Sequence, residues 1–206
     1  MKVKTVGKTI CILIVLYSIT KLLQYFFINN CNPVYNPDKF NRDKNIKNSH
    51  NCYMYALNKI DTKLAGKWKT KCNDLNSCMR MKHRPGNVNG DISKPEVSTC
   101  HNIKKGVLED NPSIYLTNQT DICKNGYYKI ASSVDENKSF HFYRQDKNNL
   151  WSHKDGSKRA TNLDAAHNTI LDPKYCNRGQ YKTFCNYFCV PNGKLYKTKS
   201  NPYYFG

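Results

Sequence analysis

Ten cysteines constrain what this chain can fold into more strongly than any other feature of its sequence. Cys11 lies in an apolar N-terminal stretch, and the other nine follow from Cys31 onward. Cysteines pair in an oxidising compartment, and nine is odd, so one should stay free or link two chains. The other eight would then form four disulfides. Structural zinc is the weaker alternative, because no CxxC pair exists and three residues separate the nearest pair, Cys185 and Cys189.

The first 28 residues look like a membrane segment. Residues 9–20, TICILIVLYSIT, are almost wholly apolar, and LLQYFFI continues the run after Lys21. Lysines precede the run, and none follows Lys21 until Lys39, so the positive-inside rule keeps the N-terminus in the cytosol. We therefore expect a single-pass signal anchor in a virion or host membrane, with the rest of the chain lumenal or extracellular. The alternative is a cleaved signal peptide with its core at Ile10–Ile19.

The remaining chain divides into two parts. Residues 29–49 are polar, contain proline and show no periodicity, so they are expected to be a stalk or an irregular lead-in. Residues 50–206 are expected to form one disulfide-rich domain. Although the hydrophobic content is only 39%, fifteen tyrosines and eight phenylalanines can fill a core.

The formal net charge of +18 favours an anionic partner, such as an acidic glycan or an anionic lipid surface. No nucleic-acid-binding motif accompanies the charge, so no specific nucleic-acid partner is expected. The basic residues are scattered, and a simple solvated surface explains them equally well. Asn118 and Asn137 lie in glycosylation sequons, which suit a lumenal chain.

Local patterns predict helices and strands after residue 50. Ser49 or Asn51 can cap a helix over 52–60, in which Cys52, Ala56, Leu57 and Ile60 share one face. A second helix is predicted over 98–109, a Pro- and Gly-rich loop over 83–95, and a strand over 126–135.

The clearest local structure is a β-hairpin. The segments SFHFYRQ and LWSHK alternate aromatic and polar residues on either side of DKNN, and Asn149 stands where a left-handed turn residue belongs. His141 lies on the first strand and His153 on the second. Any register that the turn allows leaves these two histidines within two residues of facing each other.

A cysteine at the start of a helix followed by a histidine on a later strand suggests nucleophilic catalysis. A helix N-terminus lowers the pKa of a thiol, and a histidine can take up and return its proton. We therefore assign Cys52 as nucleophile, His141 as base and His153 as the residue that orients the base, with Asp164 as second choice. The Cys52 backbone N–H would supply half of an oxyanion hole. The alternatives are a disulfide role for Cys52 and ordinary sheet positions for the histidines.

Four segments resemble a little-described family of bacterial and large-DNA-virus proteins. The matching segments, within about residues 51–190, are NCYMYAL, RPGNVNG, HFYRQDKNNLWSHKDGSKRATNLD and DPKYCNRGQYKTFCNYFCV. The family looks like a branch of the papain-like or NlpC/P60-type cysteine peptidases. The resemblance implies an α+β fold with a cysteine-bearing helix on a small antiparallel sheet, and it places Cys52, His141 and His153 at the family's Cys and His positions.

Two departures from the family pattern fall in turns. Asn149 replaces a glycine and Asp155 replaces a proline, which puts the shape of the loops in doubt more than the site.

Two functions remain open from the sequence. The first is a membrane-anchored cysteine hydrolase that acts on an amide bond in peptides or cell-wall material and uses no cofactor or metal. The second is a non-enzymatic, disulfide-stapled surface or virion protein that binds acidic glycans.

Overall fold

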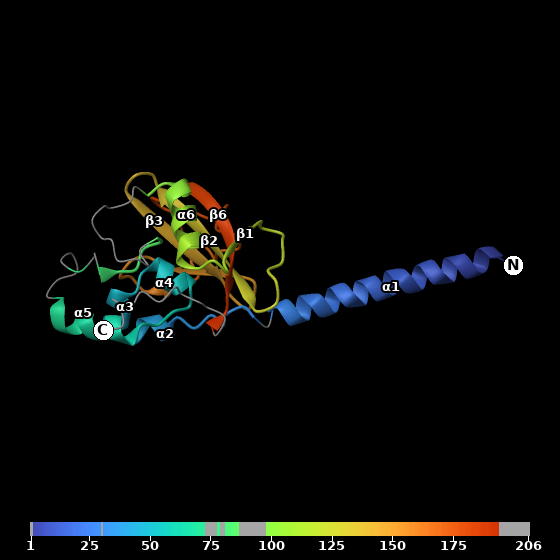
Figure 1. Cartoon of the computed structure of the whole chain (residues 1–206), viewed down its shortest axis with the longest axis horizontal. Coiled ribbons are helices and arrows are strands. Elements are labelled where there is room, and N and C mark those ends of the chain that lie inside the picture. Colours follow the sequence, from blue (N-terminus) through green and yellow to red (C-terminus); the bar gives the residue numbers. More distant parts are fainter. Residues whose placement is uncertain (1, 30, 73–77, 79–80, 87–97, 194–206) are drawn as a thin grey trace.

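The structure is a computed structural model, and it describes residues 2–29, 31–72, 78, 81–86 and 98–193. A long N-terminal helix extends away from a sheet with several short helices beside it (Figure 1). The helices are α1 (Lys2–Asn29), α2 (Asp38–Asn41), α3 (Lys44–Ser49), α4 (Cys52–Ala56), α5 (Thr62–Lys71) and α6 (Cys100–Asp110). The strands are β1 (Tyr115–Thr117), β2 (Tyr127–Asp135), β3 (Ser139–Gln145), β4 (Trp151–Lys154), β5 (Ala160–Thr161) and β6 (Thr183–Pro191).

The six strands form one antiparallel sheet in the order β1-β6-β2-β3-β4-β5. The predicted hairpin is confirmed as β3 and β4, and Asn149 has the expected positive φ of 63°. Tyr143 pairs with His153, so His141 and His153 lie two positions apart across the strand pair, as predicted. The predicted strand over 126–135 is confirmed as β2.

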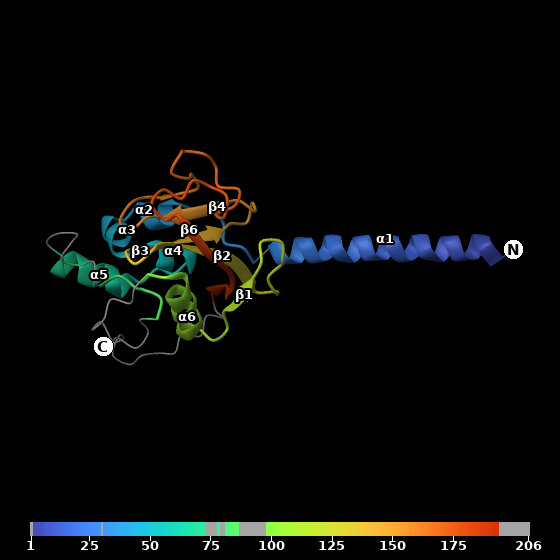
Figure 2. The ribbon, with the colours of Figure 1, turned by 90° about the horizontal axis from the view of Figure 1, so that it is seen from above.

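The two faces of the sheet have different covers. On one face, α4 and α6 pack their apolar side chains against alternate residues of β2, β3 and β6, including Ile130, Phe142 and Phe188. On the other face, Ala131, Tyr143 and Trp151 pack with Ile170, which belongs to the long segment between β5 and β6. This segment arches over the strands in Figure 2. The core therefore has a helical side and a loop side.

The helices begin where the sequence places their caps. The Asn51 side chain accepts the backbone N–H of Met54 and starts α4, and α6 begins after Thr99, whose hydroxyl accepts the N–H of Asn102. The predicted helix over 52–60 is shorter than expected, because the backbone turns left-handed at Asn58, with φ 52°.

Part of the predicted stalk is folded. Within residues 29–49, Asp43 caps α3, and Phe40 of α2 is fully buried against Tyr55 and Ala160. Helix α5 was not predicted from the sequence. Residues 87–95 of the predicted loop lie outside the described residues.

Three disulfides link the described chain, rather than the expected four. Cys100–Cys185 and Cys123–Cys189 attach α6 and the segment after β1 to β6, and Cys72–Cys78 closes a short loop. The cysteines that stay reduced are Cys11, Cys31, Cys52 and Cys176. The prediction of disulfides is therefore confirmed, with more free thiols than expected.

The predicted transmembrane helix and the single-pass membrane location are wrong. Residues 2–29 do form one helix, but no helix in the described part of the chain combines the length and apolar character needed to cross a bilayer. Within α1, Lys8 and Lys21 bound an apolar run. This run is shorter than the roughly 20 apolar residues of a membrane span.

The predicted fold class is also wrong. We expected a papain-like or NlpC/P60-like domain with a small sheet behind a transmembrane helix, whereas the chain forms a six-stranded antiparallel sheet with a few helices. The sheet is larger because β1 and β6 join it, in segments whose sequence does not predict a long strand. The Cys123–Cys189 disulfide ties β6 to the segment that follows β1.

Candidate active site

Cys52 is the first residue of α4 and is held from its N-terminal side. The preceding residue, Asn51, caps the helix and also donates its amide N–H to the carbonyl of His83 at 2.6 Å. Cys52 is reduced and only 4% exposed, so this thiol is spared from crosslinking but covered.

The thiol contacts the backbone of β3 on both sides of His141. It donates to the carbonyl of Phe140 at 3.8 Å and lies near the backbone N–H of Phe142. Burial raises the pKa of Cys52 to about 12, which outweighs the lowering by Phe142. The helix N-terminus contributes a lowering through the backbone N–H of Tyr53, but burial outweighs it.

The two predicted histidines do meet. His141 Nε2 and His153 Nδ1 lie 2.7 Å apart, and His153 Nε2 lies 2.9 Å from the carbonyl oxygen of Leu163. A carbonyl only accepts, so His153 Nε2 carries a proton and, in the neutral ring, His153 Nδ1 accepts from His141 Nε2. His141 Nδ1 is then left with a bare lone pair.

Burial supports this assignment of neutral rings. Desolvation lowers the pKa of His141 and of His153, and in His141 the neighbouring His153 lowers it further. His141 is 1% exposed, and its Nδ1 atom has no hydrogen-bond partner in the described chain. A buried acceptor without a donor is costly in a folded protein, so its presence here calls for a role.

The side chains of Cys52 and His141 lie on different faces of β3. Cys52 packs with Phe140 and Phe142 on the helical side, and side chains alternate along a strand, so His141 lies with Tyr143 on the loop side. As a result, the thiol hydrogen-bonds to the Phe140 carbonyl rather than to the imidazole of His141.

Tyr181 covers the imidazole. Its ring stacks on that of His141 with centroids 4.6 Å apart and planes 16° apart, and its hydroxyl donates to Asp155 at 3.0 Å. Asp155 is the residue that departs from the family's proline, so this departure affects the site itself and not only the loop shape. The negative charge of the Asp155 carboxylate raises the pKa of Cys52, of His141 and of His153.

Asp164, the second choice as orienting residue, has another task. Its carboxylate accepts the backbone N–H groups of Ala166, Asn168 and Asn177, and so organises the loop after β5. Burial alone would raise its pKa, but these hydrogen bonds lower it. The group that orients His153 is the Leu163 carbonyl beside it.

Two buried lysines near Cys52 were missed by the sequence analysis. Lys154 donates to the carbonyls of Lys47, His50 and Gly156 at 2.5, 2.7 and 2.7 Å, and Lys82 donates to the hydroxyl of Ser157 at 2.6 Å. Lysines are so common in this chain that no local pattern separates these two from surface lysines. The available signal was position, since Lys154 directly follows the predicted site residue His153.

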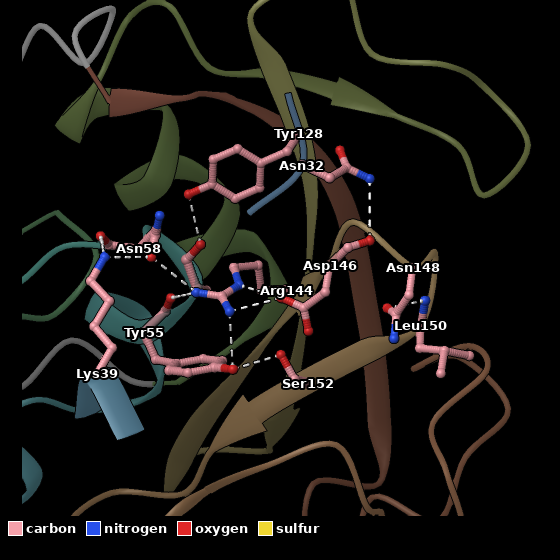
Figure 3. A network of polar contacts seen from close by, with 11 residues as sticks. Asn32, Lys39, Tyr55, Asn58, Tyr128, Arg144, Asp146, Asn148, Leu150 and Ser152 are labelled. Carbon is pink, nitrogen blue, oxygen red and sulfur yellow. Dashed lines mark hydrogen bonds and ion pairs between the residues drawn. The ribbon is translucent and has the colours of Figure 1, made fainter. Parts of the chain in front are cut away.

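A buried ionic network holds the other end of α4. The Arg144 guanidinium lies between Tyr55 and Asp146 in Figure 3, pairing with Asp146 at 2.7 Å and reaching the Tyr55 carbonyl at 3.4 Å. The Tyr55 hydroxyl in turn shares a 2.6 Å hydrogen bond with Ser152 of β4. These contacts fix α4, and with it Cys52, against the hairpin that carries both histidines.

The described residues contain no group of three or more His, Cys, Asp or Glu side chains placed to hold a metal ion. The site itself contains a thiol, two linked imidazoles and the charges around them. Such a set can transfer a proton from sulfur to nitrogen and can form a covalent bond through sulfur.

Comparison with known proteins gives one informative similarity. The chain is similar to the insoluble matrix shell protein 1 of Ruditapes philippinarum, with 29% identity over 160 residues that cover 78% of this chain and 91% of that protein. No protein-family model matches the chain, and no solved structure matches it.

Proposed function

We propose that this protein is a cysteine-dependent hydrolase of amide bonds, with Cys52 as nucleophile, His141 as base and His153 as the residue that orients the base. The observation that carries the proposal is the hydrogen-bond chain from Leu163 through His153 to His141, which leaves the Nδ1 lone pair of His141 without a donor. This lone pair would accept the thiol proton once the Cys52 side chain has moved from the helical side of β3 to His141.

The proposed reaction has two halves. First, the Cys52 thiol gives its proton to His141 Nδ1 while the sulfur attacks the amide carbonyl carbon, and the leaving amine then takes that proton as the C–N bond breaks. Second, water attacks the thioester with His141 as base, releasing a carboxylic acid and restoring the thiol. The atoms balance without an oxidant or a metal.

The buried thiol indicates how the reaction would start. With a pKa raised to about 12 by burial, Cys52 is protonated at rest and does not form a standing ion pair with His141. The thiol must therefore exchange the Phe140 carbonyl for His141 Nδ1, at about 3–4 Å, when a substrate binds.

The experiment incubates the full chain with a library of peptide amides and cell-wall peptide fragments. We expect hydrolysis by the wild type and none by Cys52→Ala, with Cys176→Ala as the matched control because Cys176 is also a free thiol. Hydrolysis that persists in Cys52→Ala, or peptide mapping that finds Cys52 in a disulfide of the mature protein, would refute the proposal.

The second candidate function is a non-enzymatic component of an insoluble extracellular matrix. The similarity to a shell matrix protein and the three disulfides favour it. It predicts that Cys52→Ala enters insoluble assemblies as efficiently as the wild type, measured as the fraction sedimented after oxidation. Loss of assembly in Cys31→Ala but not in Cys52→Ala would support this candidate through an intermolecular bridge.

A further inference from the structure

Lys82 is a buried cation whose hydrogen-bonding capacity is not filled. Its side chain is 4% exposed, and its ammonium carries three N–H donors. Within the described residues it donates to one oxygen, the Ser157 hydroxyl at 2.6 Å, and its Nζ also lies 5.3 Å from the centre of the Trp68 ring. A buried ammonium needs anionic or polar partners, so the remaining donors point to a ligand.

Two connections hold Lys82 beside the nucleophile. The carbonyl of the next residue, His83, accepts the side-chain N–H of Asn51, which directly precedes Cys52. Ser157, the acceptor of Lys82, donates in turn to the Asn48 carbonyl at 3.1 Å. Lys82 is thus connected to the segment before α4 in two ways, through its neighbour His83 and through Ser157.

The other two buried lysines are satisfied in a way that Lys82 is not. Lys154 donates to three backbone carbonyls, and Lys129 donates to those of Asn118, Gln119 and Asp121 at 2.9, 2.6 and 2.6 Å. Three acceptors match the three ammonium protons, so these two lysines stabilise the fold.

Electrostatics agrees with this geometry. Burial lowers the pKa of Lys82 to about 8, and Cys52 is the strongest influence that opposes the lowering, ahead of Asp155. The Lys82 ammonium is therefore close enough to Cys52 to be affected by the charge of a Cys52 thiolate.

We propose that Lys82 forms an anion-binding subsite of the Cys52 site and selects substrates that carry a carboxylate close to the amide carbonyl under attack. This inference rests on the proposed hydrolase function, because only a hydrolase would have such a substrate. The subsite itself would exist beside a reactive thiol whether or not the protein hydrolyses amides.

The experiment compares two alkylating reagents of similar size on the full-length protein: iodoacetate, which carries a carboxylate, and iodoacetamide, which is neutral. Peptide mass mapping gives the alkylation rate at each free cysteine. The iodoacetate-to-iodoacetamide ratio cancels both the thiolate fraction and the opening of the site. We expect this ratio to be at least about fivefold higher at Cys52 than at Cys31, which is the internal control.

The variants separate local charge from net charge. Lys82→Met should lower the Cys52 ratio to that of Cys31, Lys82→Arg should keep it high, and Lys105→Met, which removes an exposed lysine of α6, should leave it unchanged. An equal ratio at Cys52 and Cys31 in the wild type would overturn the inference even if Lys82→Met fails to fold. A raised ratio together with no hydrolysis would instead keep the subsite and reject the hydrolase.

Discussion

The two ends of α4 contact buried polar groups of opposite character. At its C-terminal end, Arg144 is surrounded by acceptors: Asp146 at 2.7 Å, the Tyr55 hydroxyl at 3.2 Å and the Asn58 side chain at 3.2 Å (Figure 3). At its N-terminal end, Cys52 and His141 are buried like Arg144, yet His141 Nδ1 accepts no hydrogen bond in the described chain.

This difference separates a structural network from a candidate site. A buried polar group that is fully hydrogen-bonded rigidifies a fold, whereas one left open costs stability and persists only where something else requires it. We therefore expect the Arg144 network to set stability and the Cys52 site to set reactivity.

The largest effect is expected from Arg144→Met. Removing the guanidinium leaves Asp146 as a buried carboxylate without its cation, and breaking such a pair costs about 3–5 kcal/mol. Chemical denaturation should show this loss in the free energy of unfolding.

The matched control is Arg42→Met. Arg42 pairs with Asp38 at 3.7 Å, but both side chains lie largely in solvent, so its loss should not measurably change unfolding. Equal effects of the two variants would show that the Arg144 network does not carry the stability that its geometry indicates.

The next largest effect on stability is expected at low pH. It arises from His50, a buried histidine whose two ring nitrogens both have hydrogen-bond partners. His50 Nε2 accepts the Asp61 N–H at 2.8 Å, and burial lowers the pKa of His50 to about 4. The unfolded chain binds this proton first, so stability is present above about pH 6.5 and is lost as the pH falls toward 4. The loss attributable to His50 approaches about 3 kcal/mol.

Unfolding of the wild type and of His50→Gln at pH 7, 5.5 and 4 measures this contribution. The pH dependence of the variant should be smaller than that of the wild type, since one of the histidines whose pKa burial lowers is gone while His83, His141 and His153 remain. Parallel curves for the two proteins would show that His50 does not take up its proton on unfolding.

A smaller effect on stability is expected from His153→Phe, but a clear effect on chemistry. The change removes the acceptor of His141 Nε2–H and should cost about 1–2 kcal/mol. In nitrogen NMR the wild-type His141 should show only the tautomer protonated at Nε2, and the variant should show both. A single unchanged tautomer in the variant would contradict the assigned hydrogen-bond chain.

The smallest effect is expected from Tyr181→Phe, which keeps the ring stacked on His141 and removes the hydrogen bond to Asp155. We expect a loss of about 1 kcal/mol in unfolding free energy and little change in Cys52 alkylation. Tyr181→Ala removes the ring as well and should speed alkylation of Cys52. Equal alkylation rates in the two variants would show that Tyr181 does not cover the site.

Local patterns predicted the parts of the site that lie on one continuous segment. The alternation in residues 139–154 predicted β3, β4, the left-handed Asn149 and the approach of His141 to His153, because strand pairing across a short turn is fixed by nearby residues. The cap at Asn51 was predictable for the same reason. In contrast, the ionised thiol was not found, because burial by distant strands decides the pKa of Cys52.

Sequence by itself determined the hairpin with its two histidines, the start of the cysteine-bearing helix and the presence of disulfides, since each depends on residue types and short spacings. Only the tertiary structure decided which cysteines pair, that Tyr181 and Asp155 close over His141, and that Lys82 interacts electrostatically with Cys52. These contacts join residues far apart in the chain, where the net effect of burial and charge depends on packing that no local pattern encodes.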